Sequence, residues 1–291
     1  MNASPIKPFP IPVVAALGPG SQPEDEALDY LPMPQGMQTY RAPQLPEPEE
    51  LAGHDGALGA LRATLAALHD AVGGHPAAPV DLGGLTPRDR QLINQVLGEG
   101  EVSAQSLGAE SVQVQESVFA GVWRVLRSAD GCVASDTIEV GAIPEVLRRA
   151  ACDDGRATGV GALPEVMPEG VMNVPSLLAE IDDQQRRWRR GQPPHIINMT
   201  LLPLTPQDIV VLDQQLGAGR VRVLSRGYGN CRITNTCVPN TWRVVYFNSQ
   251  DAVILDTIEV CDMPEVACAA REDLADSAER LTEVLAWVET S

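Results

Sequence analysis

One long segment of this chain occurs twice. Residues 85–102 (LTPRDRQLINQVLGEGEV) match residues 204–221 (LTPQDIVVLDQQLGAGRV) at a constant offset of 119. After one inserted residue the match resumes, with DTIEVGAIPEV at 136–146 corresponding to DTIEVCDMPEV at 256–266. A match at a fixed offset is the signature of a duplicated structural unit. Two copies of one unit fit within 291 residues, a length that suits one or two domains.

Each copy predicts a helix, an antiparallel meander and a second helix. A Thr-Pro pair at 86–87 and again at 205–206 places a capping hydroxyl before a proline at the first helical position. Short β-branched and aromatic segments follow, such as VRVL and WRVVYFN in the second copy, and turn residues separate them. Pro-Glu at 144–145 and 264–265 then begins the next helix. The predicted fold class is α+β, with two tandem helix–antiparallel β meander–helix repeats that form either a pseudo-twofold pair or one continuous sheet.

The regions around the repeats differ in composition. Residues 1–53 are rich in proline, which blocks helix formation and predicts a proline-rich extended N-terminal arm. Residues 54–151 combine a leucine-striped amphipathic helix with the first repeat. Residues 152–203 are expected to be a linker with a helix that ends in an arginine cluster, where arginine complements the helix dipole. The second repeat occupies residues 204–291.

The charge of the chain restricts the class of partner. The formal net charge is −18, from 39 acidic and 21 basic residues. A strongly acidic surface repels phosphate groups, so we expect neither nucleic acid nor an anionic membrane as a partner, whereas a basic protein segment would be attracted. Neither a secretory signal nor an apolar run of membrane-spanning length is evident, which predicts a cytoplasmic protein with reduced cysteines.

The sequence contains little that predicts catalysis or metal binding. It has no G-x-S-x-G motif, and its four histidines are scattered. Cys231 and Cys237 are six residues apart and Cys261 and Cys268 seven, unlike the C-x2-C spacing of zinc sites. We therefore expect no enzymatic activity and no resident cofactor. The alternative is an accessory factor that handles nickel, iron or a cluster through these four cysteines, and Arg226 and Arg232 near Cys231 favour partial activation of that thiol.

The two copies differ most where the second carries aromatic, arginine and asparagine residues. Residues 226–231 (RGYGNC) correspond to 107–112 (LGAESV), and 246–248 (YFN) correspond to 127–129 (RSA). Tyrosine and arginine are enriched at binding hot spots, so these differences favour a recognition surface in the second copy, although drift of the first copy would also explain them. The predicted partner-binding residues are Arg226, Gly227, Tyr228, Gly229, Asn230, Cys231, Trp242, Tyr246, Phe247 and Asn248.

The chain resembles one protein family over essentially its whole length, and four stretches carry the resemblance. They are LGPGSQPEDEALDYLPMPQGMQTYRAP near the N-terminus, then SRGYGNCRIT, WRVVYFNSQDAVILDTIEV and MPEVACAAREDLADSAERL. The similarity is densest over residues 17–46 and 204–285. These segments resemble the hydrogenase expression/formation proteins known as HupH, HyaF or HoxQ.

The resemblance implies a role in maturing an uptake [NiFe]-hydrogenase. It implies a chaperone that binds the precursor of the iron–sulfur small subunit in the cytoplasm before twin-arginine export. It also implies a second partner, a thioredoxin-like hydrogenase accessory protein. Some descriptions of the family instead favour nickel incorporation, which the few histidines of this chain do not favour.

Overall fold

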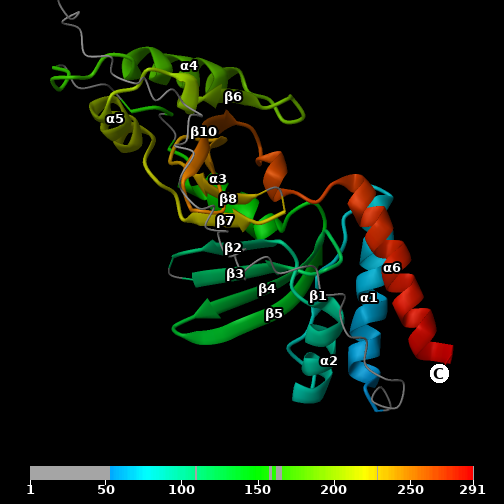
Figure 1. Ribbon diagram of the computed structural model, residues 1–291. Helices are drawn as coiled ribbons and strands as arrows, with labels where there is room; N and C mark the ends of the chain where they lie inside the picture. The colour runs from blue at the N-terminus through cyan, green and yellow to red at the C-terminus, as the bar shows by residue number, and fades with distance from the viewer. Residues whose placement is uncertain (1–52, 109, 157–158, 162–165, 228, 291) are drawn as a thin grey trace, which may run out of the picture. The chain divides into compact units, whose positions relative to one another are not determined.

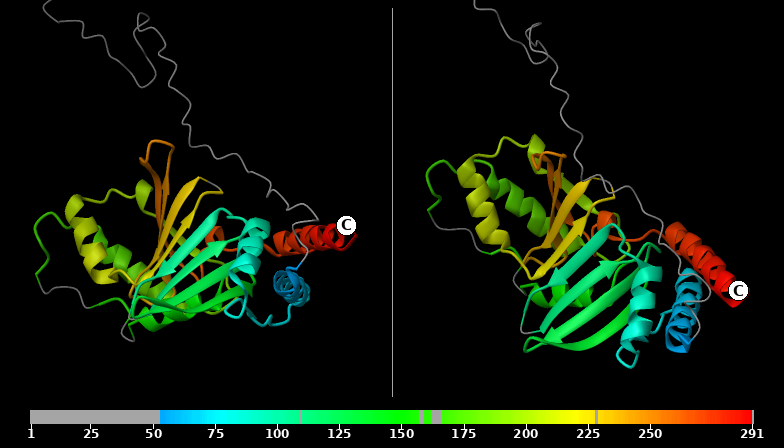
Figure 2. Two further views of the ribbon diagram at one scale, coloured as in Figure 1. Left: turned by 90° about the horizontal axis from the view of Figure 1, so that it is seen from below. Right: turned by 60° about the horizontal axis from the view of Figure 1, so that its bottom comes forward.

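The computed structural model describes residues 53–108, 110–156, 159–161, 166–227 and 229–290. Its centre is one ten-stranded antiparallel sheet with the strand order β1-β5-β4-β3-β2-β7-β8-β9-β10-β6 (Figure 1). Figure 2 shows the strands of the two halves side by side in one continuous sheet. The predicted α+β class is confirmed, and of the two arrangements considered the structure forms the continuous sheet. The predicted proline-rich arm lies outside the described residues.

The strands are mostly five to nine residues long, with a two-residue and a four-residue strand at the two edges. They are β1 (Val80–Asp81), β2 (Val102–Ser106), β3 (Glu110–Glu116), β4 (Val122–Ala129), β5 (Cys132–Val140), β6 (His195–Asn198), β7 (Val221–Ser225), β8 (Asn230–Asn235), β9 (Thr241–Phe247) and β10 (Val253–Val260). The helices are α1 (Asp55–Val72), α2 (Pro87–Leu97), α3 (Glu145–Asp154), α4 (Val174–Arg187), α5 (Pro206–Leu216) and α6 (Arg271–Thr290), with 3-10 turns η2 (Met199–Leu201) and η3 (Glu265–Ala267).

The two halves of the sheet join through the antiparallel pair β2–β7. Ala104 at the centre of β2 pairs with Val223 at the centre of β7, and these residues correspond at the offset of 119. The flanking pairs are arranged evenly about this point, since Ser103 pairs with Leu224 and Gln105 with Arg222. The pairing is therefore symmetric about the Ala104–Val223 pair, as it is about the axis of an isologous twofold interface.

One side of the sheet, called here the inner face, is apolar and covered. Alternate residues of the central strands point to this face because side chains alternate along a strand. α3 and η3 pack against it through Leu147, Ala150 and Ala267. Trp123 and Trp242, which correspond in the two halves, are both fully buried there. The central strands supply the rest of this core with Val102, Ala104, Val112, Val114, Val221, Val223, Cys231 and Ile233.

The other side of the sheet is covered only towards its two ends. α1 and α2 pack over Val122 and Ile138 of β4 and β5, and α6 lies beside α1 (Figure 1). α4 and α5 pack over Ile197 and Ile258 of β6 and β10. Between these two helical layers, the side chains of β3, β2, β7 and β8 that point away from the inner face are exposed or half-exposed. We call this uncovered central region the open face.

Corresponding arginines attach one helix in each half to the sheet. In the first half, Arg124 donates to both carboxylate oxygens of Asp136 at 3.0 and 2.8 Å, and it also contacts Asn94 on α2. In the second half, Arg243 donates to Asp256 at 3.1 and 2.8 Å and contacts Asp213 on α5. A two-pronged arginine–carboxylate pair fixes orientation as well as charge, so α2 and α5 are held at set positions beside the open face.

A buried carboxylate anchors the beginnings of α4 and α5. One oxygen of Asp208 accepts the backbone N–H groups of Met172, Asn173 and Val174 at 2.9 to 3.0 Å. The other oxygen accepts the N–H of Thr205 at 3.0 Å, and the Thr205 hydroxyl accepts the N–H of Asp208 in return. These donors would otherwise be unpaired, since the first turn of a helix has no internal acceptors. Burial favours a higher pKa for Asp208, but the four backbone donors lower its pKa to about 2.

Two regions differ from the interpretation of the sequence. Within 152–203, which we expected to be a linker, α4 packs on α5 and β6 pairs with β10, so this stretch contributes to the second half of the fold. The helix expected to begin at 264–265 is the three-residue turn η3, and α6 begins only at Arg271. The local cause is that the chain is extended after η3, with Cys268 at φ −111° and ψ 138°.

We expect Asp208→Asn to destabilise the protein by about 2 kcal/mol at pH 7, because it replaces a charged acceptor of four backbone donors. The folded-state pKa of about 2 is below the usual 3.8, so the wild-type carboxylate stabilises the fold above pH 3.8 and loses this effect as the pH falls towards 2. Urea unfolding between pH 2 and 7 measures both effects.

The matched control is Asp183→Asn on α4, which removes an exposed pair with Arg187 and is expected to cost under about 0.5 kcal/mol. Equal losses for the two variants, or an unchanged pH dependence in Asp208→Asn, would contradict the anchoring role.

Candidate partner-binding surface

Most of the predicted recognition residues lie at one end of the hairpin formed by β7 and β8, whereas Trp242 pairs with Asn235 at the other end of β8. Arg226 begins the connection between these strands, and its N–H donates to the Glu101 carbonyl at 3.1 Å. Gly229 has φ +95°, a backbone conformation that favours glycine over residues with a side chain. Gly227 and Gly229 form a local bridge within the connection. Tyr228 lies outside the described residues.

A second connection lies beside the first. Asn230 at the start of β8 pairs with Phe247 at the end of β9. The side-chain oxygen of Asn248 accepts the N–H groups of Gln250 and Ala252, both at 2.9 Å, which orders the turn into β10. Arg226 and Asn230 are exposed, and Phe247 and Asn248 are half-exposed. Together with Gly227 and Gly229, these residues define a surface that we call the hairpin tip.

Three predicted residues point instead to the inner face. Cys231 is 3% exposed and Trp242 is 1% exposed, and both belong to the core beneath α3 and η3. Tyr246 is half-buried and packs against the same core. The alternation of side chains explains the difference, since Cys231 lies between two exposed residues of β8, Asn230 and Arg232. Cys231 and Trp242 therefore support the hairpin from within rather than forming its surface.

The expected activation of Cys231 is wrong. Burial and the nearby carboxylate of Glu259 raise the pKa of this thiol to about 12, although a hydrogen bond with Tyr246 opposes the rise. Arg232 cannot offset the effect because it points to the opposite face of the sheet. Burial likewise raises the pKa of Cys268 to about 11 and raises that of Cys261. In the absence of a metal, these environments keep the three thiols protonated.

The possible metal ligands of the described residues are dispersed. Across the described ranges, no three or more histidine, cysteine or acidic side chains converge as a metal site would require. Cys237 lies apart from the other three cysteines of the alternative, since its thiol contacts the Ala218 carbonyl at 3.6 Å in the turn after α5.

The structure adds exposed residues that the comparison of the repeats did not identify. Arg232 stacks over the ring of Phe247, with 5.2 Å between the guanidinium carbon and the ring centroid. Leu224 lies directly opposite Arg232 across the β7–β8 pair, and it is 49% exposed. Arg222 lies two residues along β7 on the same side. The hairpin tip thus continues into the open face, and the two-residue alternation of VRVLS was the signal in the sequence that could have identified these positions.

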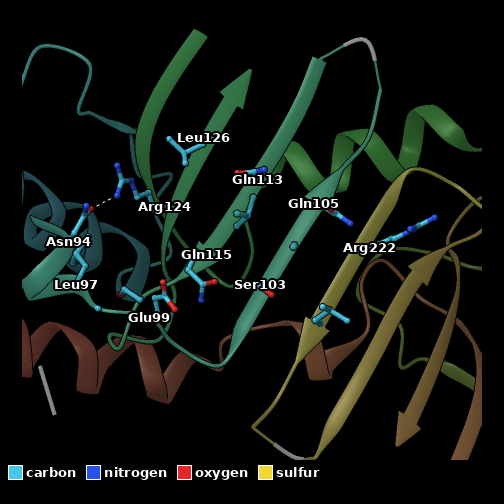
Figure 3. A pocket seen from close by; sticks show the side chains of 15 residues that line it. Asn94, Leu97, Glu99, Ser103, Gln105, Gln113, Gln115, Arg124, Leu126 and Arg222 are labelled. Carbon is cyan, nitrogen blue, oxygen red and sulfur yellow. Dashed lines mark hydrogen bonds between the residues drawn. The ribbon is translucent and has the colours of Figure 1, made fainter. Parts of the chain in front are cut away.

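A groove of about 570 Å³ lies beside α2 on the part of the open face formed by β4, β3, β2 and β7. Figure 3 shows its floor, where Ser103 and Gln105 of β2 lie between Gln113 and Gln115 of β3 and Arg222 of β7. α2 forms one wall through Asn94 and Leu97, with Glu99 just beyond the helix. The groove is therefore rich in amides, with Glu99 near α2, Arg124 of β4 in its ion pair with Asp136, and Arg222 on the side of β7.

Comparison with known proteins identifies the family. The family described as "HupH hydrogenase expression protein, C-terminal conserved region" matches this chain twice, over residues 58–167 and 171–288. The chain belongs to the HupH family. The first match extends from within α1 to beyond α3, and the second contains α4, β6 and the whole second meander.

Individual relatives cover nearly the full chain. "Hydrogenase expression/formation protein HoxQ" of Cupriavidus necator is 58% identical over 96% of this chain and 98% of its own length. "Hydrogenase expression/formation protein HupH" of Rhodobacter capsulatus is 48% identical over 96% and 98%. "Hydrogenase-1 operon protein HyaF" of Escherichia coli is 33% identical over 94% and 95%.

These relationships support a role for the chain in hydrogenase maturation, and their names are consistent with an accessory role rather than a catalytic one. Within the part of the chain that the structure describes, no helix is both long enough and apolar enough to span a bilayer.

We expect iodoacetamide at pH 8 to alkylate the exposed Cys132 and Cys152 much faster than Cys231 and Cys261. The last two are buried and their raised pKa values leave almost no thiolate at this pH. Mass spectrometry of tryptic peptides measures the rates, and urea-unfolded protein is the control in which the differences should largely disappear. Rapid alkylation of Cys231 in the folded protein would contradict its placement on the inner face.

Proposed function

We propose that this protein is a non-catalytic chaperone of [NiFe]-hydrogenase maturation. In this proposal it binds the precursor of the iron–sulfur small subunit in the cytoplasm before twin-arginine export, together with a thioredoxin-like accessory protein. The observation that carries the proposal is membership of the HupH family, with relatives named hydrogenase expression/formation proteins over almost the whole length.

The hairpin tip is the surface that we assign to the precursor. Its exposed residues Arg226 and Asn230 and its half-exposed Phe247 correspond to Leu107, Ser111 and Ser128 in the first half, so the chemistry is present on one side only. Arginine and aromatic side chains are the types most often found at the centre of binding interfaces. Paired strands flank both connections, and the Asn248 side chain orders the second, which limits the conformational entropy lost on binding.

The charge of the protein is consistent with this partner. A twin-arginine signal segment is basic, and the net charge of −18 would speed its approach by electrostatic attraction. This attraction supplies association rate and selectivity, whereas the contacts of the hairpin tip supply the stability of the complex.

We also propose that the two halves of the sheet are copies of one unit. The repeated sequence segments, the double family match and the even register of β2–β7 support this proposal. The domain limits expected from the sequence, including the arm over 1–53, stay predictions. The position of α4 and β6 favours a second unit that begins before residue 204.

We expect purified protein to retain the small-subunit precursor in a pull-down, and Arg226→Ala or Tyr228→Ala to weaken this binding by about tenfold or more. The matched control is Leu107→Ala, which alters the counterpart of Arg226 in the first half at a side chain that is 46% exposed. Its effect should be small.

The precursor should be compared with a form that lacks its signal peptide. Retention of the precursor alone assigns recognition to the signal segment, and retention of both forms assigns it to the folded body. Failure of the wild-type protein to bind either form would overturn the proposal, and equal losses for Leu107→Ala and Arg226→Ala would remove the hairpin tip from it.

A further inference from the structure

Two arginines of the open face lack an acidic partner. Among the described residues, no carboxylate lies within ion-pairing distance of Arg222 or Arg232. The arginines that structure the fold behave differently, since Arg124, Arg148 and Arg243 each pair with an aspartate. On a protein with a net charge of −18, two exposed and unpaired arginines on one surface form a local site for an anion.

The position of these arginines is defined by the strands that carry them. Arg222 lies opposite Thr234, and Arg232 lies opposite Leu224, so the two arginines are diagonal neighbours on adjacent strands. The Cα atoms of diagonal neighbours are about 7–8 Å apart. Arg232 is also held by its stacking on Phe247. The two positive charges repel each other, and an anionic ligand that contacts both would relieve this repulsion.

This spacing matches an extended polypeptide. Side chains at positions i and i+2 of a strand point to the same side and are about 6.6–6.8 Å apart. Two carboxylates at such positions can therefore each contact one arginine through charge-assisted hydrogen bonds. Residues at i and i+1 point to opposite sides, so they cannot contact both.

The remainder of the floor suits the backbone of such a segment. Gln113, Gln105 and Arg222 lie in one row across β3, β2 and β7, as their pairing shows. Gln113 lies opposite Gln105 across the β2–β3 pair, and both side chains are exposed. Each amide offers both a donor and an acceptor to a peptide group. Leu224 adds an apolar contact, and Glu99 lies at the far side of the groove from Arg222 (Figure 3). Glu99 would repel the carboxylates of an acidic segment that bound in the opposite direction, so that direction is disfavoured.

We propose that the open face binds an extended acidic segment of the partner protein, with carboxylates at positions i and i+2 held by Arg222 and Arg232. This inference rests on the proposed function, since it assigns the second contact surface of the same partner. A polypeptide is favoured over a nucleic acid because the net charge of −18 repels a long polyanion, whereas a short acidic segment experiences mainly the local field.

The first test uses the full chain and two labelled twelve-residue peptides of identical composition. One carries its two glutamates at i and i+2 in a valine- and threonine-rich background, and the other carries them at i and i+1. Fluorescence anisotropy should show binding of the first peptide that is about tenfold tighter. Equal affinities, or no binding of the first peptide, would overturn the proposal, as would tighter binding of a single-stranded oligonucleotide of the same length.

Paired variants test whether binding depends on the position of the arginine or only on the net charge of the protein. Arg232→Gln should reduce binding of the first peptide by about tenfold. The variant R232Q/Q113R keeps the net charge and moves the arginine to the corresponding position of the first half, and it should bind as poorly as Arg232→Gln. The control Arg88→Gln removes an exposed arginine of α2, on a different element from Arg222 and Arg232, and it should bind normally. Recovery of binding in R232Q/Q113R would contradict the assigned position.

The same variants distinguish this inference from the proposed function. If wild-type protein binds the small-subunit precursor and Arg232→Gln binds it equally well, the open face is not a contact surface and the proposed function stands. If the wild-type protein binds the first peptide but not the precursor, the proposed function fails while the binding of acidic segments by the open face is retained.

Discussion

The pairing of β2 with β7 is the interaction on which the rest of the structure depends. Each meander alone would end in a strand with a row of unpaired N–H and C=O groups, and such an edge readily pairs with other chains. Joining the two strands satisfies both rows at once and makes one sheet. It also brings the apolar halves of the inner face together, so that α3 and η3 cover a single continuous core.

The position of the open face follows from where the helices are attached. The pairs Arg124–Asp136 and Arg243–Asp256 reach up to α2 and α5 near the flanks of the sheet, and they place no helix over the central strands. Those central strands can carry polar side chains outward because the opposite face already supplies their burial. The groove thus exists because the helices are attached near the flanks of the sheet. Its side chains are not needed for the core and can contact a partner.

Patterns that act over short distances were predictable from the sequence. The Thr-Pro pairs mark the starts of α2 and α5, and the β-branched segments mark the strands of each meander. The side to which Cys231 and Trp242 point was not evident, because the buried side of a strand depends on partners distant in sequence. The role of α4 and β6 was missed for a similar reason, since Asp208 and β10 hold them through contacts across tens of residues.

The differences between the repeats identified part of the surface and missed another part. Arg226, Asn230 and Phe247 stood out because the first copy has other residue types there. Arg222 and Arg232 became informative only when the pairing placed them on one side of the sheet without acidic neighbours. An unpaired charge is a property of the assembled fold, and a linear comparison of residue types does not contain it.

The joint at Ala104 and Val223 also affects stoichiometry. A homodimer built around the same axis would repeat every surface residue, so it would offer two identical sites and accept a ligand in either direction. Here the two sides of the axis are encoded separately, with Gln113 on one side where Arg232 stands on the other. The sheet is nearly symmetric in its strand pairing but not in its surface residues. It can therefore bind a single copy of a ligand in one orientation.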